Sequence, residues 1–215
     1  TVRDFASQAA AASLVVEVTP GNALAAVPWQ IISGIELPHE TYSGKTNTLK
    51  AVARGVPVPF DFIWDFGDGS DPVTNTATTV AAGYGLDARH AYTGSEGTPF
   101  YATIRVLQTN GVVLSDTYPL ILRPKTLEVE MKVAIDECLW HLHKTQNRYV
   151  IDANNKGGYW TDRDGYAINA SASAVQAFAI NGHLMTGDAA QDPYVETVQR
   201  GVNYLLTAMS TIQIG

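Results

Sequence analysis

The fold of the first half of the chain is decided by the stretch Phe60-Asp61-Phe62-Ile63-Trp64-Asp65-Phe66-Gly67-Asp68-Gly69-Ser70. Its aromatic residues recur at every second position, so they share one face of an extended strand, while its first two aspartates lie on the other face. The Asp-Gly pair that follows predicts a tight turn, because glycine adopts positive φ without a steric penalty.

On both sides of this stretch, short apolar runs alternate with turn residues, which is typical of β structure. Further strands are predicted over residues 14–18, 46–53, 100–106, 112–114 and 118–122. Several short strands separated by turns predict an antiparallel β-sandwich.

After Pro124 the apolar residues recur at three- and four-residue steps, which predicts helices. The first is expected over 126–146, with Leu127, Met131, Ile135, Cys138 and Leu142 on its core face. A second is expected near 168–182, and a third from Asp192-Pro193, a helix-start signal, to about Met209. A polar loop is expected from about 147 to 165.

The predicted fold is therefore multidomain β plus α, and 215 residues suffice for two domains of roughly 100–200 residues each. We expect a partly β lead-in over 1–40, a sandwich over 41–124 and a helical segment of about three helices over 125–215. The boundary lies near Arg123-Pro124-Lys125.

The run Trp64–Ser70, together with His90-Ala91-Tyr92 and Tyr101–Val106, resembles the PKD domain, an immunoglobulin-like β-sandwich of extracellular proteins. The resemblance covers about residues 42–123 and rests on Trp64, Asp65, Gly67, Asp68, Gly69, His90 and Tyr92. It implies that Tyr92 faces the core, and we expect His90 to make structural hydrogen bonds. Trp64 would anchor the core, and the Asp-Gly-Ser turn would bond its own backbone.

The helical half resembles the prenyltransferase/squalene-cyclase repeat of α/α-toroid proteins. The resemblance rests on Leu139–Leu142, Gln146, Gly158-Tyr159-Trp160, and the segments 172–183 and 192–206. In that family a glutamine and a Gly-x-Trp tie successive helices together, which implies this role for Gln146, Gly158 and Trp160. A closed toroid needs many more helices, so this segment would be a partial toroid.

Three acidic residues, Asp65, Asp68 and Asp71, are calcium candidates, because calcium prefers oxygen ligands and some PKD domains bind it near this region. The alternative, favoured because acidic turns are common without metal, is that these carboxylates only stabilise the turn. Calcium is therefore a possible cofactor, and no other is predicted.

No catalytic or cofactor-binding residue is predicted. Asp162-Arg163-Asp164 approaches the acid motif of squalene-cyclase relatives but lacks its third carboxylate, which favours a solvated turn. Cys138 and His141 share a helical face, but two ligands do not make a zinc site, so core packing of Cys138 is favoured.

Composition excludes several classes. A net charge of −7 speaks against nucleic-acid binding, and no apolar run approaches the roughly 18 residues of a membrane span. The chain starts at Thr1 and holds one cysteine, so we expect an excised or processed piece without an internal disulfide. The PKD resemblance implies an extracellular, periplasmic or cell-surface location.

These features favour a non-catalytic interaction or spacer module of a larger secreted or cell-surface protein, with a protein or polysaccharide partner. Two alternatives stay open: a fragment of a terpene-cyclase or prenyltransferase-like enzyme with aromatic residues such as Trp140 and Phe178 lining its pocket, or a substrate-presenting accessory domain of a secreted hydrolase. An open helical ring would also expose apolar faces, so self-association is expected.

Overall fold

The computed structural model describes residues 2–3, 9–10, 30–32, 38–108, 111, 113–152 and 155–208. The strand predicted over 14–18 and the predicted helix end at Met209 lie outside the described residues, as does most of the 1–40 lead-in. Within that lead-in, β1 (Val2–Arg3) pairs antiparallel with β2 (Ala9–Ala10).

Two larger sheets are built from the first half of the chain. One has the strand order β4-β10-β9-β6-β7 and the other the order β3-β5-β8. All their pairings are antiparallel except that of β4 with β10. The strands are β3 (Gln30–Ile32), β4 (His39–Thr41), β5 (Thr46–Arg54), β6 (Phe60–Asp65), β7 (Val73–Ala77), β8 (Leu86–Ala91), β9 (Pro99–Leu107) and β10 (Val113–Leu122). The short helix α1 (Val80–Gly83) joins β7 to β8.

One hydrophobic core contains buried residues of both sheets, so we call the strands β3 to β10 the two-sheet unit. The alternation predicted for residues 60–66 is confirmed: Phe60, Phe62 and Trp64 are buried on β6, while Asp61 is exposed. The Trp64 indole donates to the carbonyl of Leu86 on β8 at 3.2 Å, which links the two sheets through the core.

The turn after β6 requires glycine. Gly67 has φ +72°, and a Cβ added there would lie 2.3 Å from the carbonyl oxygen of Tyr101. Both the backbone conformation and the close approach to the neighbouring strand therefore exclude a larger side chain.

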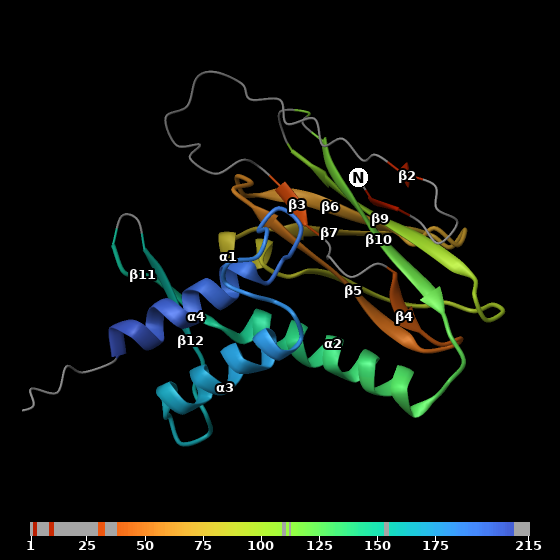
Figure 1. Ribbon diagram of the computed structural model, residues 1–215. Coiled ribbons are helices and arrows are strands. Elements are labelled where there is room, and N and C mark those ends of the chain that lie inside the picture. The colour runs from red at the N-terminus through yellow and green to blue at the C-terminus, as the bar shows by residue number, and fades with distance from the viewer. Residues whose placement is uncertain are drawn as a thin grey trace, which may run out of the picture.

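Within the described residues, three helices follow the two-sheet unit, in agreement with the predicted change of period. They are α2 (Leu127–Thr145), α3 (Ala167–Ile180) and α4 (Val195–Ala208). Thr126 caps α2, because its hydroxyl accepts the backbone N–H of Val129. The β-plus-α class is thus confirmed, and Figure 1 shows the three helices gathered on one side of the sheets.

The prediction of a polar loop over 147–165 is wrong for the first part of this segment. This segment forms a hairpin of β11 (Asn147–Val150) and β12 (Lys156–Tyr159). The two strands are four residues long and show no apolar–polar alternation to detect, and β12 packs against α4.

The prediction of which face of α2 lies in the core is also largely wrong. Leu127, Met131 and Ile135 are 74%, 54% and 41% exposed, and Cys138 is exposed as well. The helix instead buries its opposite side, which includes Val129, Val133, Trp140 and His143, and it contacts β4 and β5. Both sides carry apolar residues, so periodicity alone chose the wrong one.

A second hydrophobic core joins the helices to the sheets. It contains Val52 of β5 together with Trp140, Phe178 and Val198, which come from α2, α3 and α4 in turn. Because a strand residue belongs to the helical core, the two halves of the chain share buried surface.

Candidate functional site at the junction of sheets and helices

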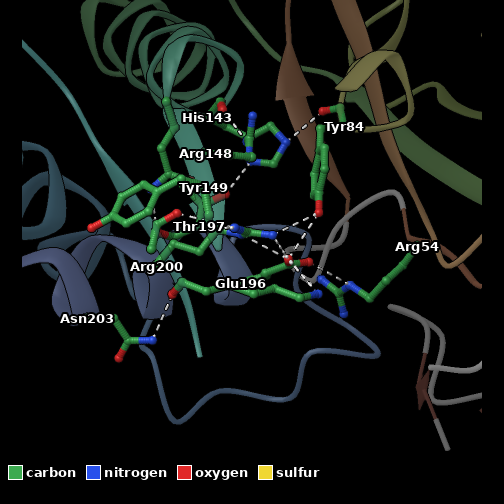
Figure 2. A network of polar contacts seen from close by, with 12 residues as sticks. Arg54, Tyr84, His143, Arg148, Tyr149, Glu196, Thr197, Arg200 and Asn203 are labelled. Carbon is green, nitrogen blue, oxygen red and sulfur yellow. Dashed lines mark hydrogen bonds and ion pairs between the residues drawn. The ribbon is translucent and has the colours of Figure 1, made fainter. Parts of the chain in front are cut away.

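A polar network lies where α4 meets β5, α1 and the hairpin, and it is centred on Glu196 (Figure 2). Glu196 and Arg200 are one turn apart on α4, and the Arg200 Nε and Nη2 atoms donate to Glu196 Oε1 at 3.0 and 2.8 Å. The hydroxyl of Tyr84, just after α1, donates to the same oxygen at 3.1 Å.

Two further cations approach this carboxylate. Arg54, the last residue of β5, places Nε 3.4 Å from Glu196 Oε2, and Lys156 of β12 places Nζ 3.7 Å from Oε1. Burial alone would raise the pKa of Glu196, but the positive charges of Arg200, Lys156 and Arg54 outweigh it and lower the pKa. Glu196 is therefore ionised near neutral pH.

The next element of the network is His143, which is 1% exposed. Its Nε2 lies 2.7 Å from the carbonyl oxygen of Tyr84, and its Nδ1 lies 2.7 Å from the hydroxyl of Thr197. A carbonyl can only accept, so Nε2 carries the proton and Nδ1 accepts from Thr197. Burial lowers the pKa of His143 to about 3, which keeps the ring neutral.

A cation also lies on the aromatic face of Tyr84. The guanidinium carbon of Arg148 is 4.3 Å from the centre of that ring, and Arg148 Nη2 donates to the carbonyl of His143 at 2.5 Å. Tyr84 thus contacts residues of α2, α4 and the hairpin together.

Five residue pairs among the described residues also form polar contacts between the two-sheet unit and α2. Lys50 of β5 pairs with Asp136, and Glu137 accepts the backbone N–H and hydroxyl of Thr48 at 3.0 and 2.8 Å. Asp87 on β8 accepts from the Trp140 indole at 2.9 Å and from Lys144. Glu40 binds Lys132 of α2 at 2.8 Å, and Arg123 at the same distance.

The motif residues of the helical half lie at the contacts between helices. Gln146, at the end of α2, donates Nε2 to the carbonyl of Thr197 on α4 at 2.8 Å. Gly158 lies against this amide, since a Cβ there would be 2.5 Å from the Gln146 side chain. The Trp160 indole donates to the carbonyl of Leu142 at 2.7 Å, and its backbone N–H donates to the hydroxyl of Ser171 at 3.1 Å.

The motif residues of the β half surround the 65–70 turn. Asp65 Oδ1 accepts the backbone N–H of Gly67, and Asp68 Oδ1 accepts that of Ser70, both at 3.0 Å. Asp68 Oδ2 lies 2.7 Å from His90 Nε2. Burial opposes ionisation of Asp68, but hydrogen bonds from Ser70 and His90 outweigh it and lower its pKa to about 2.

His90 and Tyr92 continue inward from this turn. The His90 ring stacks on Phe66 with centroids 4.0 Å apart, and the Tyr92 hydroxyl donates to the carbonyl of Phe66 at 3.0 Å. Tyr92 is fully buried, and burial raises its pKa. These contacts place both residues in the packing of the turn against the core.

Among the described residues, no group of three or more His, Cys, Asp or Glu side chains is arranged to hold a metal ion. Asp65 and Asp68 use oxygens for the turn, and Asp71 is exposed. Calcium binding at these residues stays a prediction. The Asp162 carboxylate accepts the backbone N–H groups of Asp164 and Tyr166 at 3.0 and 2.8 Å, as expected for a turn.

Reasoning from sequence missed the residues of the junction network, namely Arg54, Lys156, Glu196 and Arg200. Charged residues are normally solvated, so nothing marks Arg54, Glu196 and Arg200 as largely buried before the halves of the chain are brought together. The one available signal was the spacing of Glu196 and Arg200, which permits an ion pair along a helix.

No family model and no curated protein matches the chain. Among solved structures, it is similar to a family 76 glycoside hydrolase from a bovine Bacteroides thetaiotaomicron strain, with 11% sequence identity and a TM-score of 0.24. The alignment covers 64% of this chain and 28% of that chain, so the chain spans less than a third of that structure's length. A TM-score this low supports no argument about fold or activity. Within the part of the chain that the structure describes, no helix is long and apolar enough to cross a membrane.

Proposed function

We propose that the chain is a non-catalytic interaction module of a larger secreted or cell-surface protein. In this proposal the two-sheet unit is an immunoglobulin-like sandwich of the PKD type, and the helices are a partial α/α toroid fixed to it. The observation that carries the proposal is the solvent-exposed apolar stripe of α2, which we define as Leu127, Met131, Ile135 and Cys138.

These four residues recur at steps of four, four and three, so they lie along one side of α2. The opposite side of the helix packs on β4 and β5, and it carries the ion pair with Lys50 and the hydrogen bond with Thr48. The stripe is therefore presented by a helix whose position is fixed from behind. A contiguous exposed apolar surface of this kind is typical of protein–protein contacts, so we propose a protein partner rather than a polysaccharide.

Two titratable groups with strongly shifted pKa values, His143 and Tyr92, support a non-catalytic role. His143 has both ring nitrogens in hydrogen bonds to protein atoms, and the Tyr92 hydroxyl is bonded to a backbone carbonyl. A general base or acid must reach a substrate proton, and these buried groups are already engaged within the fold.

The prenyltransferase-like alternative receives less support. It would place Trp140 and Phe178 in an apolar ligand pocket. These residues are instead 2% and 0% exposed, and both are part of the second hydrophobic core. The accessory-domain alternative differs from our proposal in the partner, since it requires polymer binding.

Cys138 makes the proposal testable without altering the fold, because its thiol is an exposed reporter within the stripe. We expect a maleimide to label Cys138 rapidly in the dilute isolated chain and much more slowly in the intact parent protein at its native location. Labelling of Cys138 and sedimentation of the isolated chain at rising concentration test whether the partner is a second copy of the chain.

The matched variants are Met131→Asp, within the stripe, and Leu206→Asp, an apolar residue on α4 that is 62% exposed. Protection of Cys138 should be lost with the first and kept with the second. Equal, rapid labelling in the isolated chain and in the parent protein would sink the proposal, as would hydrolytic or prenyl-transfer turnover by the isolated chain.

A further inference from the structure

A cavity of about 700 Å³ lies beside the junction network, between the end of β5, α1 and α4. Its size falls within the range of small-molecule sites. One part of its wall is apolar and is formed by Val56, Pro57, Val58, Phe60 and Val80. The other part is charged and is formed by Arg54, Lys156, Glu196 and Arg200, with Tyr84 beside them.

The charged part has more cations than anions. Three positive side chains meet one carboxylate, which leaves an excess of two positive charges in a chain whose net charge is −7. Glu196 Oε1 accepts hydrogen bonds from Arg200 and Tyr84. The Nζ atom of Lys156 lies 3.7 Å from the same oxygen, and the Lys156 side chain is 51% exposed. The ammonium group of Lys156 thus remains open to a further acceptor.

Arg54 has the same shortage of acceptors. Its Nη1 donates to the carbonyl of Ala189 at 2.5 Å and its Nε lies 3.4 Å from Glu196 Oε2 in an ion pair, but its buried Nη2 makes no hydrogen bond to any described residue. Leaving charged donors unpaired in a protein interior is costly, so such groups usually have an acceptor. An anionic oxygen group beside Arg54 and Lys156 would supply acceptors and offset the charge.

We propose that this cavity binds a small amphipathic organic anion. Its carboxylate or phosphate head lies between Arg54 and Lys156, where a guanidinium and an ammonium can both donate to oxygen. Its apolar body lies against Val58, Phe60 and Val80. The site is a separate one from the apolar stripe of α2, so it goes beyond the proposed interaction function.

The test uses isothermal titration calorimetry of the whole chain with three probes of similar size, namely phenylacetate, phenyl phosphate and the neutral phenylacetamide. We expect at least one anion to bind more than about 10-fold tighter than the amide, because a charge-assisted hydrogen bond contributes more than a neutral one. Comparing the two anions shows whether the head is a carboxylate or a phosphate.

Lys156→Met should weaken anion binding about 10-fold, since it removes one charged donor. The control is Lys125→Met, which removes a lysine that pairs with Glu130 and does not line the cavity. Val80, which is 66% exposed at the cavity wall, allows a charge test that leaves the buried network intact. Val80→Glu should weaken anion binding, and Val80→Lys should strengthen it.

Arg54→Met is a second variant of the head-group site, and its folding is checked by circular dichroism because Arg54 also pairs with Glu196. If Arg54→Met unfolds, the variants Lys156→Met, Val80→Glu and Val80→Lys still test whether the cavity binds anions. Equal affinity for the anions and the amide, absence of binding by all three probes, or equal effects of Lys156→Met and Lys125→Met would overturn the proposal. Ile135→Asp, a substitution in the apolar stripe of α2, should leave probe binding unchanged. Failure of the cavity proposal can therefore be distinguished from failure of the proposed interaction function.

Discussion

The ion pair between Lys50 and Asp136 should respond very differently to removal of its two partners. The side chain of Lys50 is 2% exposed, whereas those of Asp136 and Glu137 are 36% and 35% exposed. Asp136→Ala leaves a buried ammonium with only Glu137, at 4.0 Å. Lys50→Met instead leaves two carboxylates that water can reach, with an apolar side chain of similar length in the buried position.

We therefore expect Asp136→Ala to lower the free energy of unfolding by about 3 kcal/mol, near the lower end for loss of one partner of a buried pair, because Glu137 remains. Lys50→Met should change it by less than about 1 kcal/mol, since replacing a buried charge by an apolar group is often neutral. The double variant should recover about 2 kcal/mol relative to Asp136→Ala, because the stranded charge is gone.

The measurement is urea unfolding at pH 7, followed by far-ultraviolet circular dichroism and by tryptophan fluorescence. Coincidence of the two transitions establishes that one free energy describes the unfolding. A Lys50→Met variant that is destabilised as much as Asp136→Ala, or a double variant that shows no recovery, would refute the argument from unequal burial.

Three further outcomes are expected. Gly67→Ala should lower the unfolding free energy by more than about 1 kcal/mol, measured in urea, because the added Cβ meets the Tyr101 carbonyl and the residue has φ +72°; an unchanged midpoint would contradict this. Burial holds the pKa of His143 at about 3, below its ordinary value of 6.5, so the unfolded state takes up the proton first and stability should fall as pH drops from about 6.5 towards 3. Thermal midpoints across this range should fall less in His143→Gln, and an equal fall would point to other groups. Cys138→Ser should shift the thermal midpoint very little, because the side chain is exposed; a large loss would restore the core packing of Cys138.

Several elements could be predicted because their signals are local. Aromatic residues at every second position identified β6, and the Asp-Gly pair identified the turn after it. Helical spacing after Pro124 predicted α2 to within a residue at each end. The hairpin of β11 and β12 carried no such pattern, since its strands are only four residues long without alternation, and β12 packs against α4.

The side of α2 that faces the sheets could not be predicted in the same way. Leu127, Met131 and Ile135 form the more regular apolar stripe, yet the helix buries the side with Val133 and Trp140. That side also provides the partners of Lys50 and Asp87, which lie more than fifty residues earlier in the chain. A periodic pattern reports that a helix has apolar sides, and only its neighbours select which of them is buried.

The sequence by itself determined the class of the fold, the strand and turn at 60–70, and the positions of three helices, because these depend on residues close together in the chain. Only the tertiary structure decided that Arg54, Glu196 and Arg200 form one buried network beside a cavity and that an apolar stripe remains exposed. Burial of a charge depends on which distant groups arrive to pair with it, and exposure of an apolar side chain depends on which do not.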